Sequence, residues 1–368
     1  TVGVASNGNG SISYKNDSTR TLGWKTSEMP KSALLFSPRV GFNWDVNGDQ
    51  SFQVRGGAGI FTGRIPFVWI SNHYGNTGVE IARLSLATAG SDTVRFNPTV
   101  ANSLSENLKD TTKVTSTTEL NLTGNDFKMP QTFRMNLGFD YKLPEDIILT
   151  VDGMYTKNLN EIFYSDLNLG DRRDTTQFGS TLPGNRGVFG IYNGRNTTAR
   201  FHDGRKSFTN VILLSNTDMG YSYNMSVQLQ KSWKAGLDLM AAYTHSASYD
   251  INSGLSSQAV SQWRFNYIQD NPNTPTLSRS YFDIPHRVIA SAAYRIELIP
   301  EVSLKASLFY EGRSGQPFSY IYDGDINADG QTSNDLIYVP KDKNDIALVT
   351  GSARASDATY DALDRFIT

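Results

Sequence analysis

The fold class is decided by residues 39–62, RVGFNWDVNGDQSFQVRGGAGIFT. Apolar side chains occupy alternate positions on both sides of Asn47-Gly48, and polar or small residues fill the positions between them. This period of two predicts strands with one apolar and one polar face, and Asn-Gly accepts the positive φ of a tight hairpin. A soluble sandwich would bury the apolar face, whereas a membrane barrel would turn it to lipid and keep the polar face on a wet lumen.

The same alternation recurs in three later hairpins, at Phe133–Thr156, Ser222–Thr244 and Ile284–Glu311. The four hairpin turns are all short and lie near Asn47, Pro144, Ala235 and Pro300. The connections between hairpins are all long and run from Arg64 to Pro130, Asn158 to Gly220 and Ser246 to Phe282. Outer-membrane barrels sort their connections in this way, with short periplasmic turns and long extracellular loops.

Weaker signals lie outside the hairpins. Gly10–Tyr14 is a candidate short strand, and Asn16–Lys31 is expected to be a loop because it is rich in Ser, Thr, Asn and Lys. Within the second long connection, strand extensions are expected at Glu161–Leu169 and Asn210–Ser215. The first long connection, from Arg64 to Pro130, sustains no strand pattern, so no element is predicted there.

Composition excludes several function classes. The 34 Lys and Arg against 36 Asp and Glu give a formal net charge of -2, which does not suit a nucleic-acid partner that needs a basic surface. No cysteine is present, so there is no disulfide framework and no thiol chemistry. The four histidines (His73, His202, His245, His286) have no metal-ligand spacing, and no Gly-x-Ser-x-Gly motif occurs. We therefore expect neither an enzyme nor an organic cofactor.

Several motifs carry a family resemblance. In chain order they are FSPRVGFNW (36–44), VRGGAGIFTGRIP (54–66), GYSYN (220–224), QLQK (228–231), DIPHR (283–287), GRSGQPFSY (312–320) and NDLIYVP (334–340). They resemble the C-terminal barrel of TonB-dependent outer-membrane transporters of the Oar-like type. The resemblance covers most of the chain from Leu34 onward.

The expected fold is all-β, an antiparallel transmembrane β-barrel with long extracellular loops. The resemblance implies a barrel of about 22 strands, of which residues 1–368 would supply about half. The chain is thus expected to be one partial barrel domain without the plug and N-terminal domains of the family. Its expected location is the bacterial outer membrane.

The resemblance also implies a function and partners. The expected function is TonB-dependent uptake of a nutrient ligand (a glycan, a peptide or a chelate), with membrane lipid, TonB and a plug as partners. One alternative is a structural or secretion-associated barrel in a cell-surface complex, which would contact other surface-exposed proteins. A second alternative is a secreted β-sandwich adhesin or glycan-binding module.

Aromatic residues on the long loops are candidate ligand contacts, since their rings can stack on a sugar or line a peptide groove; packing within the loops is the alternative. The candidates are Phe67, Trp69, Tyr74, Trp263, Tyr267, Tyr281 and Phe282. Other aromatics lie near the ends of the apolar strand faces, as in the interfacial girdles of membrane barrels. They are Phe42, Trp44, Phe52, Tyr141, Tyr155, Tyr223, Tyr243, Tyr294 and Tyr310.

The polar strand faces would be expensive to expose to lipid, but they suit a wet lumen, where they can bond to one another, to water or to a plug. The residues on these faces are Arg39, Asn43, Asp45, Gln53, Arg55, Arg134, Asn136, Asp140, Asp152, Asn224, Gln228, Gln230, Lys305 and Glu311.

One stretch, DINADGQTSND at 325–335, matches a calcium-binding loop. Oxygen-bearing side chains occupy positions 1, 3 and 5, Gly occupies position 6, and a backbone carbonyl serves at position 7. The predicted ligands are Asp325, Asn327, Asp329, Gln331 and Asp335. The twelfth position, where a bidentate Glu belongs, holds Leu336, and Asp335 lies one residue earlier. A solvated Asx-turn loop has a similar composition, so it remains the alternative.

Overall fold

The structure is a computed structural model. It describes residues 4–6, 11–16, 20–25, 30–75, 83–86, 98–99, 114–170, 173–174, 186–189, 191–193, 196–198, 208–345, 349–350, 353–354 and 357–367. The chain divides into two compact units. The first comprises residues 1–167, 207–263 and 276–318, and the second comprises residues 168–206, 264–275 and 319–368. Parts of the first two long connections, and His202, lie outside the described residues.

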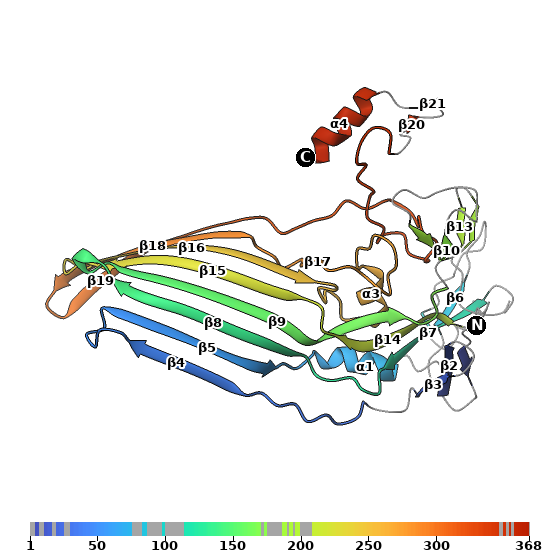
Figure 1. The fold of residues 1–368 in the computed structure, drawn as a ribbon, viewed down its shortest axis with the longest axis horizontal. Coiled ribbons are helices and arrows are strands. Elements are labelled where there is room, and N and C mark those ends of the chain that lie inside the picture. The colour runs from blue at the N-terminus through green and yellow to red at the C-terminus, as the bar shows by residue number, and fades with distance from the viewer. Residues whose placement is uncertain are drawn as a thin grey trace. The chain divides into compact units, whose positions relative to one another are not determined.

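Eight long strands form an antiparallel meander in the first unit (Figure 1), and each pairs with the next along the chain. They are β4 (Arg39–Asp45), β5 (Phe52–Thr62), β8 (Gln131–Lys142), β9 (Ile148–Asp166), β15 (Tyr221–Ser232), β16 (Leu237–Asp250), β18 (His286–Ile299) and β19 (Val302–Arg313). All four predicted hairpins and their short turns are confirmed. The sheet is open: its outer long strands, β4 and β19, do not pair with each other.

The hairpin turns use the expected turn chemistry. Gly48 (φ 75°) and Gly236 (φ 87°) take positive φ values in the β4–β5 and β15–β16 turns. The β8–β9 turn contains the short 3-10 helix η3 (Pro144–Asp146), in which Glu145 (φ 62°) and Asp146 (φ 58°) also take positive φ. Both carboxylates form ion pairs of 2.8 Å, Glu145 with Lys231 and Asp146 with Lys142, which hold this strained turn in place.

The strand β9 extends beyond the meander, and further strands join its far end. There it pairs with β14 (Phe208–Thr217), which in turn pairs in parallel with β7 (Val114–Thr123). Edge strands β6 (Arg83–Leu86) and β17 (Ser278–Arg279) pair with β7 and β16. A small core forms where β7 and β14 meet, from Leu120, Leu122 and Val211 with Leu167 and Leu213 packed against them. The expected strand extensions are therefore confirmed, apart from residues 167–169.

Three predictions about the loops were wrong. The Arg64–Pro130 connection contains a helix, α1 (Phe67–Gly75), as well as β6 and β7. A short apolar run such as residues 67–70 fits a helix or a strand equally well, and Pro66, just before α1, is tolerated at a helix start.

A second helix, α3 (Ala259–Arg264), lies in the third connection. Strand β3 (Arg20–Lys25) occupies the expected N-terminal loop and pairs with β2 (Ser11–Asn16), which confirms the candidate strand near Gly10–Tyr14. Strand β1 (Val4–Ser6) completes this small sheet.

The described part of the second unit contains short strand pairs and a helix. Two-stranded pairs are formed by β10 (Arg173–Asp174) with β11 (Gly187–Val188), β12 (Ile191–Asn193) with β13 (Asn196–Thr198), and β20 (Val349–Thr350) with β21 (Ala353–Arg354). The helix α4 (Asp357–Ile367) was not predicted. Val188, Ala328 and Ile326 form a small apolar cluster in this unit.

Candidate functional site

The polar face of the meander carries a charged network across three strands. The guanidinium of Arg55 on β5 donates to both carboxylate oxygens of Asp152 on β9, at 3.0 and 2.9 Å. It also pairs with Asp140 on β8, whose other oxygen accepts a 2.6 Å hydrogen bond from Thr150. The three charged side chains keep between 28% and 38% of their surface exposed, so this face is a wet, internally paired wall.

The opposite face is apolar and exposed. Val40 is 74% exposed and Leu308 is 73% exposed. Because no second sheet covers these side chains in the described part of the chain, the sandwich alternative is wrong. Exposed apolar residues on this face recur along the sheet; they include Phe42, Trp44, Leu137, Tyr223, Met225, Val227, Leu229, Leu239, Val288, Tyr294, Leu304, Leu308 and Tyr310.

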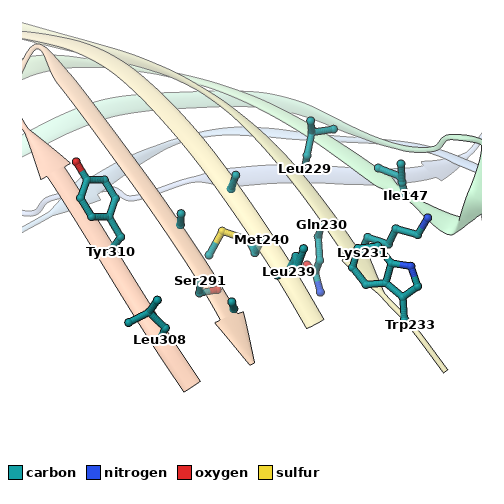
Figure 2. Close-up of a pocket in the computed structure, with 13 residues that line it drawn as sticks. Ile147, Leu229, Gln230, Lys231, Trp233, Leu239, Met240, Ser291, Leu308 and Tyr310 are labelled. Atoms are coloured by element: carbon teal, nitrogen blue, oxygen red, sulfur yellow. The ribbon is translucent and has the colours of Figure 1, made fainter. Parts of the chain in front are cut away.

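A hollow of about 520 Å³ lies on this apolar face (Figure 2). Small side chains at Ala241, Ala290 and Ala292 form its floor, and larger side chains such as Leu229 and Tyr310 flank it. The hollow follows the alternation of small and large residues on one sheet face. The hollow therefore belongs to the exposed apolar face of the sheet, and its lining does not supply the convergent polar groups of a ligand site.

Aromatic side chains cluster at both ends of the apolar face. At the end nearer the long connections, Tyr221 stacks on Tyr249 at 5.0 Å, and Tyr243 donates or accepts a 2.7 Å hydrogen bond with His286. At the turn end, Phe52 meets Tyr141 edge to face at 5.7 Å. On β18 the distance from His286 to Tyr294 is about 26 Å along the strand at roughly 3.3 Å per residue, similar to the apolar band of a membrane barrel.

Comparison with protein families assigns residues 3–361 to the family described as "Outer membrane beta barrel domain". The chain belongs to this family. It is thus an outer-membrane β-barrel domain, located in the bacterial outer membrane. Barrels of this kind turn an apolar face to lipid, so lipid contact is expected at the exposed apolar face. No helix in the described part of the chain is long and apolar enough to cross a membrane.

Two solved receptors of Pseudomonas aeruginosa are similar to the barrel domain. The mutant ferric enterobactin receptor PfeA shares 10% identity with a TM-score of 0.37 over 76% of this chain and 28% of the receptor chain. The siderophore receptor PirA shares 8% identity with a TM-score of 0.31 over 75% of this chain and 34% of its own. The barrel domain thus spans about a third or less of these receptors' length. No curated protein matches its sequence.

The candidate ligand-contact aromatics have very different exposures. Trp263, on α3, is only 1% exposed, so it offers no contact surface in this structure. Five others are exposed: Phe67, Tyr74, Tyr281 and Phe282 in the first unit, and Tyr267 in the second. Tyr281 and Phe282 meet edge to face at 5.5 Å.

The seventh candidate, Trp69, lines a polar pocket of about 210 Å³. Its indole N–H donates to the carbonyl of Ser256 at 2.8 Å, which ties α1 to the segment after β16. The pocket also contains Glu161 of β9 and Asp250 of β16. Glu161 lies on β9, six residues beyond Tyr155, which is one of the aromatic residues near the ends of the apolar strand faces. Burial raises the pKa of Glu161, and the charge of Asp250 adds to the effect. Sequence reasoning missed both carboxylates, because nothing local shows that β9 and β16 bring them together.

The predicted calcium loop is a compact turn in the second unit. The two carboxylate oxygens of Asp325 accept hydrogen bonds from the backbone N–H groups of Asp329 (3.1 Å) and Gly330 (3.0 Å). Asp329 accepts from the N–H of Gln331 at 2.7 Å, and Asp335 accepts from the N–H of Ile326 at 3.0 Å. The five predicted ligand residues are therefore brought into one turn.

Burial sets the electrostatics of this turn. Desolvation, with repulsion from Asp329, raises the pKa of Asp325 to about 6 and that of Asp335 to about 7. The pKa of Asp329 is also raised, mainly by burial. Within the described ranges, no three His, Cys, Asp or Glu side chains stand ready to hold a metal ion. An ion at this turn would therefore require the side chains to close around it.

Proposed function

We propose that the barrel domain forms part of the wall of a TonB-dependent outer-membrane transporter of the Oar-like type, which takes up a nutrient ligand such as a glycan, a peptide or a chelate. The observation that supports this most is the Arg55–Asp140–Asp152 network on the face opposite the lipid. A wall of paired, partly hydrated charges suits a lumen that holds water or a plug. The ordered motifs that resemble the Oar-like family support the same function.

The open sheet fits a wall that needs further strands. Eight long strands in one meander cannot close a barrel of about 22 strands. We therefore infer that the remaining strands and the plug come from elsewhere in the complete transporter. TonB would act on that plug, so the energy-coupling step lies outside these residues.

Ligand contacts are proposed at the long connections, where the Trp69 pocket combines an aromatic ring with two carboxylates. Its volume of about 210 Å³ suits one part of a ligand rather than the whole. Carboxylates beside an aromatic ring accept hydrogen bonds from hydroxyl or amine groups while the ring packs on an apolar face. Sugars and basic peptides both present such groups.

The test is uptake in cells that carry the full-length gene. Labelled oligosaccharides, peptides and ferric chelates are supplied to wild-type cells, to a deletion strain and to a strain without TonB. The proposal predicts that at least one ligand class is lost in both mutant strains and restored by the gene. Uptake of all three classes that stays unchanged in the deletion strain would contradict it. Loss of a surface complex in that strain would then favour the structural or secretion-associated barrel.

A further inference from the structure

The turn from Asp325 to Asp335 buries carboxylate and amide groups, and its hydrogen bonds do not satisfy all of their oxygens. Asp335 is 0% exposed and Asp329 is 5% exposed, and the amides of Asn327 and Asn334 are fully buried beside them. Asn334 donates to Asp329 at 2.8 Å, so its amide lies against the carboxylate group of the loop. Buried carboxylates are ordinarily paired with cations or coordinate a metal.

Two buried oxygens of this turn have no hydrogen-bond partner among the described residues, the amide Oδ1 of Asn334 and the carboxylate Oδ1 of Asp335. Buried polar atoms in native proteins are nearly always satisfied, and a bound ion is one way to satisfy them. An ordinary Asx turn would have the same backbone geometry and the same hydrogen bonds to backbone N–H groups. The two orphaned oxygens are a separate observation, because that geometry does not require them.

The nearest described cation does not complete the turn. Nη1 of Arg186 lies 3.8 Å from the orphaned oxygen of Asp335, beyond hydrogen-bonding distance, and Nη1 has no hydrogen-bond partner in the part of the chain that the structure describes. The Nη2 of Arg186 donates to the carbonyl of Leu336. Among the described residues, Arg186 is the cation that pairs with this turn, and it pairs with only one of the three carboxylates.

We propose that the Asp325–Asp335 turn binds one calcium ion. The ligands are oxygens only: the carboxylates of Asp325, Asp329 and Asp335, the amide oxygens of Asn327 and Asn334, and the backbone carbonyl of Gln331. Calcium accepts six to eight oxygens in flexible geometry, whereas magnesium demands a near-ideal octahedron and zinc favours nitrogen and sulfur ligands. Small rotations of these side chains close the set, and water completes it.

The ion would stabilise more than its own turn. The backbone of Ile268 bridges to that of Asp335, and the carbonyl of Asp270 accepts a hydrogen bond from Asn327 at 3.4 Å. Asp270 also accepts from the N–H of Gly187 at 2.7 Å. The turn thus gathers three chain segments of the second unit, around residues 187, 268–270 and 325–335. Calcium is expected to order all three together.

Calorimetry and limited proteolysis test the proposal on the full-length protein in detergent. After removal of divalent ions with a chelator, calcium chloride should bind with a Kd of about 10⁻⁴–10⁻³ M, as in extracellular calcium modules, since the bidentate Glu is missing. Calcium should slow cleavage within residues 319–345, and magnesium at the same concentration should not. Identical digestion of the wild type with calcium and with chelator would overturn the proposal.

Matched variants test whether the ion binds at the carboxylates of this turn. Asp335→Asn and Asp325→Asn each remove one charge with little change in shape and should weaken calcium binding at least tenfold. Asp342→Asn removes an exposed carboxylate from the same unit and should leave the Kd unchanged. Wild-type affinity in Asp335→Asn would overturn the proposal. If a variant fails to fold, the chelator comparison on the wild type still decides the outcome.

Discussion

Arg55 reaches Asp152 across the backbone of Gly138. In the sheet register Arg55 on β5 lies opposite Gly138 on β8, and Gly138 lies opposite Asp152 on β9. A Cβ atom added at Gly138 would lie 2.1 Å from Oδ1 of Asp152. The missing side chain therefore allows one guanidinium to join three strands of the lumen wall.

Gly138→Ala is expected to destabilise the barrel domain by about 1–3 kcal/mol, the usual cost of forcing an extra methyl group into a filled site. The matched control is Gly153→Ala on the neighbouring strand, where the added Cβ would meet the nearest atom at an ordinary 3.8 Å. Urea unfolding of the protein folded in lipid vesicles measures both variants. Equal unfolding free energies for the two variants would contradict this account of the Arg55 network.

A charge on the lipid face should be costly and a charge on the lumen face should not. Phe42→Arg is expected to lose about 2–4 kcal/mol if the site lies near the bilayer midplane and less near an interface. Asn43→Arg places the same side chain on the other face of β4 and should have a small effect. The same vesicle unfolding experiment compares them. A larger loss for Asn43→Arg would mean that the faces are reversed.

The raised pKa of Glu161 predicts that the stability of the folded protein depends on pH. Burial raises its pKa, so the folded state holds the proton more tightly than the unfolded state. The stability contributed by the protonated group is complete below the unfolded pKa and is lost as the pH rises through the raised folded pKa. Glu161→Gln keeps an oxygen for the 2.9 Å bond from the N–H of Ile162. The variant should unfold like the wild type at pH 4 and at a higher temperature than the wild type at pH 8, and a wild-type advantage at pH 8 would contradict this.

The orientation of the barrel domain is testable on intact cells. The connections 64–130, 158–220 and 246–282 are expected outside the cell, and the turns near Asn47, Pro144, Ala235 and Pro300 are expected in the periplasm. A protease site inserted after Leu255, which is exposed, should be cut by external protease. The same site inserted after Ala235 should be cut only after the outer membrane is opened. Cutting after Ala235 in intact cells would reverse the topology.

The four hairpins could be predicted because their signals are local: alternation within each strand and turn residues between them. The helix α1 could not, since the apolar run at its start fits either element and only tertiary packing decides between them. The parallel pairing of β7 with β14 joins residues near 120 and 211 and leaves no local signal.

The candidate site was predictable in part. Alternation placed Arg55, Asp140 and Asp152 on one face, but their pairing depends on strand register, which only the structure gives. Exposure was the weakest prediction, as the buried Trp263 shows. The residues from Asp325 to Asp335 form one turn because their hydrogen bonds connect near neighbours along the chain, whereas calcium binding there stays a prediction. The two orphaned oxygens could not be predicted, because they depend on which side chains are buried together.

Spin labelling tests the central claim, that one face of this sheet meets lipid and the other meets water. This chain has no cysteine, so single cysteines introduced at Val227, Gln228, Leu229 and Gln230 can be labelled one at a time. In vesicles, labels at 227 and 229 should respond to oxygen dissolved in the bilayer, and labels at 228 and 230 should respond to a water-soluble nickel chelate. Alternation with this period supports the barrel wall. Labels at 227 and 229 that are inaccessible to both reagents, as in a packed protein core, would contradict it.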